Sequence, residues 1–343
     1  MNRHPATVAE LEERLSRPTD LSRQAMEAMQ GDLLILGVGG KMGPSLARLA
    51  KRSAEEVGKQ GFKVIGVSRF STSEVRNELS AAGVQTLACD LLDPLARAKL
   101  PQVQNVLLMT AFKFGAAEHP DLAWATNVYL PGALAEQFAQ SRLVCFSTGN
   151  VYPMVPVESQ GCSEEVPVQP VGEYGTTGVG RERLLEFVSR RYGTPVSLVR
   201  LNYAVELRYG VLVDLGLQLL AGQPIDLGVS HVNLVWQGYA NAVTLHEFAH
   251  AASPARHLNL TGPEVLSVRS LAEQLASLLE VPALFTGTPG PHALLNNASR
   301  CLAQYGPPDV DVPTLLQWTA VWLKHGGATF NKPTKFQVQD GKY

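Results

Sequence analysis

The chain has 343 residues, of which 45% are hydrophobic and 17% are charged, and its formal net charge is -2. This length is sufficient for one large α/β domain with an additional lobe. The balanced charge argues against a nucleic-acid-binding surface, and no apolar run approaches the ~20 residues of a membrane helix. Four widely spaced cysteines and an N-terminus without an apolar run predict reduced thiols in a cytoplasmic protein.

Residues 1–30 are polar and are expected to form two short helices. Thr7 and Glu10 have the spacing of a capping box, and Pro18 with Thr19 would end one helix and start the next. We expect this N-terminal extension to pack on the outside of the protein or against a second subunit, and to have no catalytic role.

From residue 31 to about residue 200, short apolar runs alternate with longer amphipathic ones. The apolar runs include "DLLILG", "FKVIGVSR", "NVLLMTA" and "RLVCFSTG", and runs such as "GRERLLEFVSRRYG" have helical spacing. Buried strands that alternate with helices of this length predict a parallel sheet covered on both faces. We therefore expect a Rossmann-type, doubly wound α/β domain over 31–200, with a contribution from about 228–252.

Beyond residue 200 the pattern changes to helical segments separated by loops that contain glycine and proline. Residues 201–326 are expected to form mainly a smaller substrate-binding lobe. The polar residues 327–343 are expected to form a loosely attached C-terminal tail.

The segment "GVGGKMG" follows the first predicted strand and opens the first predicted helix. Gly37, Gly40 and Gly43 have the spacing that lets a chain turn sharply, bring its backbone close to a diphosphate and pack a helix on a sheet. The free amides at the helix N-terminus would then bind the phosphates. Lys41 and Met42 lie within this predicted dinucleotide-binding loop.

The end of the second predicted strand bears on the choice of coenzyme. An acidic residue that would hold a ribose hydroxyl is absent there, and Ser68 and Arg69 take its place. A hydroxyl and a guanidinium suit a 2′-phosphate, to which Lys41 would add a second positive charge, so NADP is favoured and NAD remains an alternative. In the opposing interpretation, Arg69 is a solvated surface residue. Asp90, after the third strand, would contact the adenine amine.

Together these segments resemble the extended short-chain dehydrogenase/reductase family, whose members include nucleotide-sugar epimerases and dehydratases. The resemblance extends over about residues 31–326. Beyond the glycine loop, it is carried by Asp90 with Leu91, Ala111, Asn127, "STGNVYP", Tyr174 and Glu182.

The resemblance implies roles for these residues. Thr148 would bind the reacting hydroxyl or carbonyl, and Tyr174 would exchange its proton while hydride moves to or from the nicotinamide. Asn127 would support the hydrogen bonding of the site, and Leu91 and Ala111 would line the coenzyme. The resemblance also implies a homodimer, and a lobe over the substrate that includes the segments around 203–210 and 258–266.

The chain departs from the family pattern at two points: "WQGYANAV" lacks the acidic residue expected near Tyr239, and Gly178 stands where a lysine should follow the tyrosine by four residues. That lysine would lower the tyrosine pKa, and an unperturbed tyrosine of pKa ~10 is phenolate in only about one molecule in a thousand at pH 7. Lys113, after the fourth strand, is the favoured substitute. Arg181 lies near the same helix face but is expected at the surface.

Two hypotheses follow. The first is an atypical NAD(P)-dependent epimerase, dehydratase or reductase acting on a sugar or nucleotide-sugar. The second is a catalytically inactive NADP-binding sensor that uses the same pocket to control a partner.

A further motif, "HEFAH" at 246–250, matches the zinc signature in which two histidines share a helix face with a glutamate base. The competing interpretation is an amphipathic helix whose histidines are incidental. We favour the latter and expect no metal.

Overall fold

The computed structural model describes residues 4–342. At its centre is a seven-stranded parallel sheet with the order β12-β7-β5-β4-β1-β2-β3, which confirms the expected doubly wound Rossmann-type fold. The strands of this sheet are β1 (Leu33–Leu36), β2 (Val64–Ser68), β3 (Gln85–Ala88), β4 (Asn105–Leu108), β5 (Arg142–Thr148), β7 (Val196–Leu201) and β12 (Arg256–Leu260).

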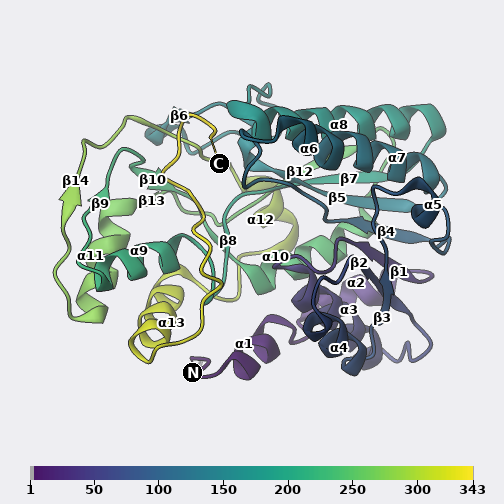
Figure 1. Ribbon diagram of the computed structural model, residues 1–343, viewed down its shortest axis with the longest axis horizontal. Coiled ribbons are helices and arrows are strands. Elements are labelled where there is room, and N and C mark those ends of the chain that lie inside the picture. Colours follow the sequence, from purple (N-terminus) through teal and green to yellow (C-terminus); the bar gives the residue numbers. More distant parts are fainter. Residues whose placement is uncertain (1–3, 343) are drawn as a thin grey trace.

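Helices cover both faces of the sheet, which explains why β1 and β4 are buried at every position instead of alternating. In Figure 1, α6, α7 and α8 lie above the sheet, whereas α2, α3 and α10 lie below it. These helices are α2 (Asp20–Ala28), α3 (Gly43–Glu56), α6 (Pro120–Trp124), α7 (Leu130–Gln137), α8 (Gly172–Tyr192) and α10 (Gln237–His246). Two further helices, α4 (Ser73–Ala81) and α5 (Pro94–Arg97), follow β2 and β3.

The strand order reverses between β1 and β4. From β1 the chain proceeds through β2 to β3 on one side, and from β4 it proceeds through β5, β7 and β12 on the other. In an open parallel sheet such a reversal leaves a crevice beyond the carboxyl ends of the strands. The glycine loop, which follows β1, lies at this crevice.

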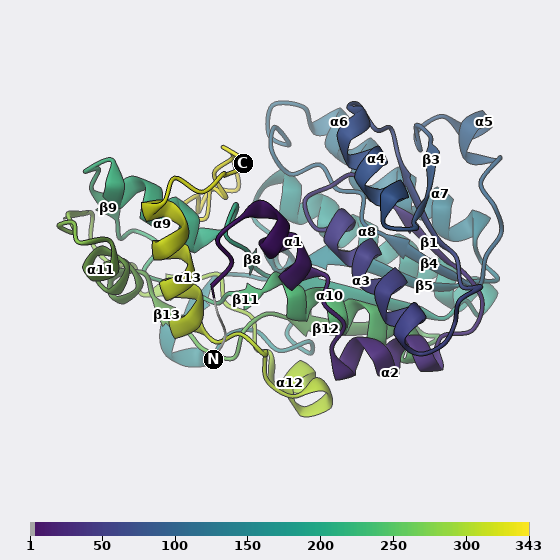
Figure 2. The ribbon, with the colours of Figure 1, turned by 90° about the horizontal axis from the view of Figure 1, so that it is seen from below.

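The smaller lobe contains α9 (Val211–Leu220), α11 (Val268–Leu279) and α13 (Val312–Lys324), which pack together at one end of the molecule (Figure 2). Trp236 and Trp318 meet edge to face with their ring centres 5.8 Å apart, and Trp322 is also buried, as expected for packing residues. A short helix, α12 (Ser299–Tyr305), joins the lobe to the sheet by contacting β12.

The segment 256–260 differs from its expected place in the lobe. It forms β12, which pairs with β7 along its whole length and so completes the edge of the main sheet. The contribution of the second half of the chain to the Rossmann part therefore extends past 252 to Leu260. Pairing with β7 provides hydrogen-bond partners for the backbone N–H and C=O groups of this segment.

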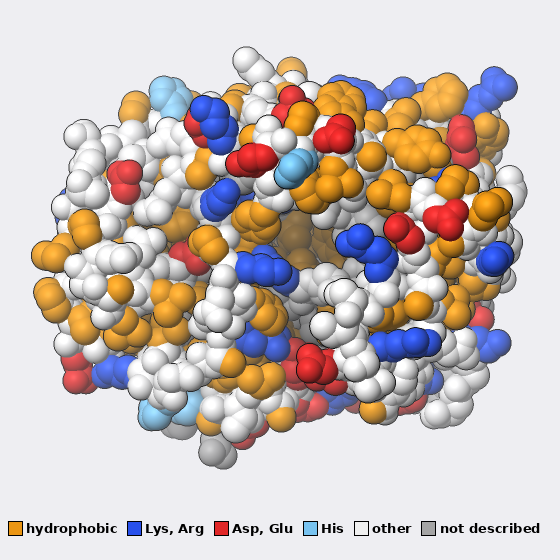
Figure 3. Space-filling model, viewed as in Figure 1, with side chains coloured by type: hydrophobic (Ala, Val, Ile, Leu, Met, Phe, Trp, Pro, Cys, Tyr) orange, Lys and Arg blue, Asp and Glu red, His pale blue; other side chains and the backbone are white. Residues whose placement is uncertain are grey.

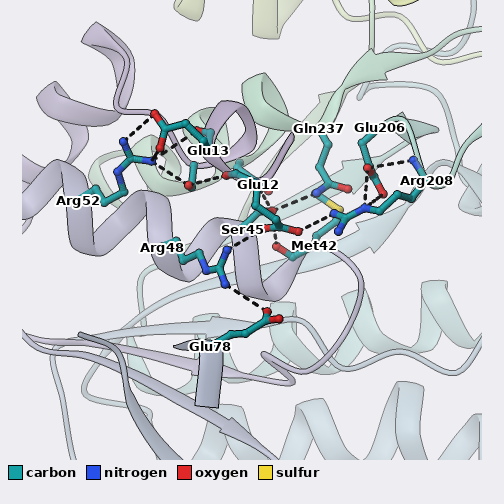
Figure 4. Close-up of polar contacts among 12 residues, drawn as sticks. Glu12, Glu13, Met42, Ser45, Arg48, Arg52, Glu78, Glu206, Arg208 and Gln237 are labelled. Atoms are coloured by element: carbon teal, nitrogen blue, oxygen red, sulfur yellow. Dashed lines mark hydrogen bonds and ion pairs between the residues drawn. The ribbon is translucent and has the colours of Figure 1, made fainter. Parts of the chain in front are cut away.

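The N-terminal extension packs on its own chain. The capping box of Thr7 and Glu10 is present at the start of α1 (Val8–Leu15). Figure 4 shows Glu12 of α1 between two arginines: Arg48 of α3 at 3.2 Å and Arg208 of the lobe at 2.7 Å. Both arginine side chains are at most 17% exposed. Through these two ion pairs of Glu12, α1 links the glycine-loop helix to the lobe.

The C-terminal segment is docked, which corrects the expectation of a loosely attached tail. Phe336 is only 3% exposed and belongs to the main hydrophobic core. Thr334 donates hydrogen bonds from its amide and hydroxyl to the Asp214 carboxylate, at 2.8 and 2.5 Å. A buried apolar anchor of this kind outweighs the polar composition from which the loose attachment was predicted.

No helix within residues 4–342 has both the length and the apolar character needed to cross a membrane. All four cysteines are unpaired, as expected.

Candidate functional site

A cavity of about 490 Å³ opens at the crevice, between the glycine loop, the ends of β4 and β5, and the lobe. In Figure 3 the centre of this face is hollowed, with Lys and Arg side chains on two sides of the hollow. The residues predicted from the sequence that line the cavity are Gly37, Gly40, Lys41, Met42, Gly43, Ala111, Lys113, Thr148 and Tyr174.

The three glycines of the loop are required for different reasons. Gly37 has a φ of +93°, and a Cβ added to Gly43 would lie 2.1 Å from the Val38 carbonyl oxygen. A Cβ on Gly40 would meet only the Gly37 carbonyl oxygen, at an ordinary 3.5 Å. The fold itself therefore needs Gly37 and Gly43, whereas Gly40 keeps a stretch of backbone open toward the cavity. Such a cradle fits a diphosphate.

Lys41 extends from the glycine loop toward the lobe. Its ammonium lies 3.2 Å from the centre of the Tyr209 ring and 5.0 Å from that of Phe114. Burial, together with the nearby Lys332 charge, lowers the pKa of Lys41 to about 8. The sequence predicted that Lys41 would join Arg69 as a second positive charge for a 2′-phosphate. In the structure, the Lys41 side chain forms part of the cavity wall.

The residues expected around the adenosine lie at the ends of β2 and β3. Ser68 is packed against the glycine loop, because a Cβ on Gly39 would lie 2.5 Å from its hydroxyl oxygen. Arg69 is exposed, and Leu91 is buried. Asp90 is exposed and its carboxylate accepts a hydrogen bond from the Leu92 amide at 3.0 Å, so it caps its own turn.

Thr148 and Tyr174 face the same cavity from two elements. Thr148 ends β5, is 5% exposed, and its hydroxyl lies 3.0 Å from the Asn150 side-chain oxygen. Tyr174 lies in the first turn of α8. The threonine and the tyrosine therefore line the same cavity from different elements.

Gly178 has a packing role that accounts for the missing lysine. A Cβ added there would lie 3.0 Å from the Thr148 methyl carbon and 3.3 Å from a Val151 methyl carbon. Helix α8 therefore approaches the end of β5 more closely than a side chain at 178 would allow without displacement.

Lys113 lies beside Tyr174. Its ammonium is 5.6 Å from the centre of the Tyr174 ring, and it donates a hydrogen bond to the Thr334 carbonyl oxygen at 3.4 Å. Burial, followed by repulsion from Lys41, lowers the pKa of Lys113 to about 8. The structure thus places a cation at the tyrosine from a different strand end.

Arg181 is buried, and the expectation that it lies at the surface was wrong. It is 3% exposed, and its guanidinium donates to Asn127 at two oxygens and to the Phe146 carbonyl oxygen, at 2.6–3.0 Å. These acceptors come from distant segments, which local helix spacing does not reveal. Asn127 is fully buried in a π-helical turn and also exchanges two hydrogen bonds with the Phe112 backbone, so it positions the segment that carries Lys113.

Lys332 and Thr334 are among the cavity residues that were not anticipated from the sequence. Both belong to the C-terminal segment, whose polar composition resembles that of an unattached tail. No local signal connects Thr334 with its partners Asp214 and Lys113, which are 120 and 221 positions away.

The zinc interpretation of "HEFAH" is not supported by the arrangement of its side chains. The rings of His246 and His250 stack with centres 5.5 Å apart, but Glu247 is fully buried and forms an ion pair with Arg256 at 3.2 Å. Its carboxylate also accepts hydrogen bonds from Ser197 and Tyr305. Glu247 is therefore a structural residue with no capacity left for a base.

Elsewhere within residues 4–342, Glu182, Glu186 and His257 come close enough to hold a metal. Arg200 holds the Glu182 carboxylate at both oxygens, at 2.7 and 2.9 Å, and Arg183 holds Glu186 at 2.9 Å. These carboxylates are already neutralised, so the cluster is best described as an ion-pair network. Arg200 is thus structural.

The fold and the cavity define a dinucleotide-binding protein of the Rossmann type. A sequence model of the NAD dependent epimerase/dehydratase family matches residues 33–205, which is half of the chain. The chain belongs to this family. No curated protein matches the sequence.

Several solved structures share the fold at low sequence identity. UDP-glucuronic acid 4-epimerase from Bacillus cereus, in complex with NAD, has a TM-score of 0.70 and 16% identity over 85% of this chain and 99% of its own. UDP-glucose 4-epimerase from Thermus thermophilus, also with NAD, has 0.69 and 18% over 87% and 100%. dTDP-glucose 4,6-dehydratase from Bacillus anthracis, with NAD, has 0.70 and 15% over 85% and 96%.

Proposed function

We propose that this protein is an NAD(P)-dependent enzyme that oxidises or reduces a carbinol or ketone carbon of a sugar-like substrate, as a complete reaction or as part of an epimerisation or dehydration. The single observation that carries the proposal is that the glycine cradle and Thr148, Tyr174 and Lys113 line one cavity. A site of about 490 Å³ falls in the range of small-molecule pockets.

The residues present fit a nicotinamide coenzyme. The open backbone at Gly40 and the N-terminus of the 14-residue helix α3 offer amides and a positive dipole end to a diphosphate. Ser68 and the exposed Arg69 would take a 2′-phosphate, so we propose NADP in preference to NAD. When bound, the coenzyme supplies the hydride donor or acceptor.

The side chains of this protein provide the proton transfer. Thr148 holds the reacting oxygen by a hydrogen bond, and Tyr174 donates a proton to it in reduction or accepts one in oxidation. The Lys113 ammonium, 5.6 Å from the centre of the Tyr174 ring, places a positive charge beside the group that exchanges the proton. This arrangement substitutes for a lysine at position 178.

A turnover assay tests the proposal. The protein is incubated with NADPH or NADP⁺ and a panel of sugars, sugar acids and nucleotide-sugars, and nicotinamide absorbance is followed. We expect at least one panel member to change the redox state of the coenzyme. Tight coenzyme binding without any redox change would instead favour the alternative of a non-catalytic, coenzyme-sensing protein, for which the glycine at 178 is the specific support.

We further propose a homodimer. Helices α6 and α8 and the π-helical turn that follows α6 contact one another. Four of their aromatic side chains are nevertheless 44–54% exposed. The upper right of Figure 3, over these helices, shows gathered hydrophobic side chains. Exposed apolar patches of this kind mark interfaces. The four residues are Trp124, Tyr129, Phe187 and Tyr192.

Light scattering coupled to size exclusion tests the dimer. The wild type should elute at twice its chain mass, and Phe187→Glu should elute as a monomer with an unchanged melting temperature. A wild-type monomer would contradict this proposal.

The cytoplasmic location remains a prediction consistent with the unpaired thiols.

A further inference from the structure

The C-terminal strap, residues 329–342, crosses the molecule between its two parts. In Figure 1 it runs up from α13 between the lobe and the sheet and ends near the N-terminus of α8. Near its start, the Phe330 amide donates to the Arg208 carbonyl oxygen at 3.0 Å. Near its end, Gly341 touches Gly172, because a Cβ added to Gly341 would lie 2.6 Å from the Gly172 Cα. The strap therefore connects the lobe to the helix that carries Tyr174.

The centre of the strap is fixed beside the reacting residues. Thr334 is held from one side by the Asp214 carboxylate and from the other by the Lys113 ammonium, whose distance from the Tyr174 ring centre is 5.6 Å. Phe336, two residues later, is packed in the hydrophobic core. Several independent contacts therefore make the strap a wall of the site.

Beyond this wall, the strap fills the part of the lobe that adjoins the catalytic residues. Phe336, Val338 and Gln339 face Tyr152 and Tyr203 across a remaining space of about 30 Å³. That volume holds a single water molecule. A nucleotide that extends from a substrate at Tyr174 into this part of the lobe would meet the strap.

Three lysines from separate segments line the main cavity: Lys41 of the glycine loop, Lys113 after β4 and Lys332 of the strap. Asp214 is the carboxylate that attracts both Lys41 and Lys113, and its oxygen already accepts two hydrogen bonds from Thr334. Burial is the main cause of the lowered pKa values of Lys41 and Lys113, and repulsion from a neighbouring ammonium adds to it in each case. An anion placed between the ammonium groups would relieve it.

We propose that the substrate is a small sugar derivative that carries its own carboxylate or phosphate and no nucleotide, and that Lys332 of the strap helps to hold this anion beside Lys113. This inference rests on the proposed coenzyme-dependent reaction. It narrows the substrate class, and it assigns the strap a direct role in specificity.

Binding to the coenzyme-saturated protein tests the proposal by calorimetry. The probes are glucuronate and glucose 6-phosphate, with glucose as the neutral reference and UDP-glucuronic acid as the nucleotide-bearing one. We expect at least one of the two anionic sugars to bind tenfold or more tightly than glucose, and UDP-glucuronic acid to bind no more tightly than glucuronate. The two anionic probes separate a carboxylate site from a phosphate site.

Matched variants locate the contact. Lys332→Gln should weaken binding of the anionic sugar about tenfold, as expected for one lost charge-assisted hydrogen bond, and should leave NADPH affinity unchanged within twofold. Lys335→Gln is the control, because Lys335 belongs to the same strap but does not line the main cavity. It should change the affinity less than twofold.

Three results would overturn the proposal: tighter binding of UDP-glucuronic acid than of glucuronate, no preference for either anionic sugar over glucose (absence of binding included), or equal effects of Lys332→Gln and Lys335→Gln. Failure of the proposed function would be seen separately, either as a protein that does not saturate with coenzyme or as coenzyme binding without redox change in the turnover assay.

Discussion

The two ends of the cavity reach their chemistry in different ways. At the glycine loop, the proposed binding depends on backbone: the fold requires glycine at 37 and 43, and Gly40 leaves the loop free of a side chain on the cavity side. At the other end, the proposed substrate binding and proton transfer depend on side chains that follow β4 or belong to β5, α8 and the C-terminal strap, which meet only in the folded chain. The backbone end follows the family pattern, whereas the side-chain end departs from it at Gly178. A positively charged side chain can be supplied by a different segment of the chain more readily than the backbone turn of the glycine loop can.

The largest expected effect is at the catalytic end. Tyr174→Phe removes the proton donor and should lower turnover by about 10²–10⁴-fold, the usual contribution of general acid–base catalysis. Coenzyme affinity should remain within twofold, which a fluorescence titration with NADPH would check. Turnover within threefold of wild type would show that another group transfers the proton.

The next effect tests whether Lys113 supplies the displaced charge. Lys113→Met should lower turnover about 10–100-fold, because the proton transfer would lose the positive charge beside it. Because the pKa of Lys113 is about 8, its ammonium loses its proton as pH rises through that value, so wild-type turnover should decline above about pH 8.

The groups facing Lys113 allow a control for this pH profile. Lys41 and Lys335 repel its charge and Asp214 attracts it. Lys41→Met should therefore move the alkaline decline to higher pH, whereas Lys113→Met should remove it. An unchanged decline in Lys113→Met would assign the titration to a different group.

A smaller effect is expected at the backbone end. Gly40→Ala places a methyl group in the open cradle and should weaken NADPH binding about tenfold, or ~1.4 kcal/mol. Its melting temperature should stay near wild type, because the added Cβ has room in the folded chain. Gly61→Ala, where an added Cβ meets nothing within 4 Å, is the control outside the cavity and should bind normally. Equal affinities in both variants would remove the loop from the binding site.

The smallest effect concerns the choice of coenzyme. Arg69→Ala should weaken NADPH binding a few-fold to about tenfold, because the exposed pair of a guanidinium and a phosphate is partly screened. NADH binding should not change. Arg76→Ala, an exposed arginine of α4, serves as the reference. If both coenzymes lose affinity equally, Arg69 does not read the 2′-phosphate.

The features predicted from the sequence are those encoded locally. Apolar runs such as "LLIL" identify strands buried on both faces, and the glycine spacing identifies the turn after β1. Thr148 and Tyr174 were found through motif resemblance and do line the cavity.

The features that the sequence did not reveal depend on contacts between distant segments. The burial of Arg181 depends on acceptors in the π-helical turn Ala125–Tyr129 and in β5, and the docking of the strap depends on Asp214. The direction of Lys41 depends on the Tyr209 ring. None of these partners lies within a helical turn or a strand repeat of its counterpart, so periodicity contains no information about them.

The central claim is that the open backbone at Gly40 binds a nicotinamide coenzyme in the cavity shared with Tyr174. The most direct measurement is a fluorescence titration of the wild-type chain with NADPH. We predict saturable binding of one coenzyme per chain. If NADPH, NADP⁺, NADH and NAD⁺ all fail to bind, the claim is contradicted.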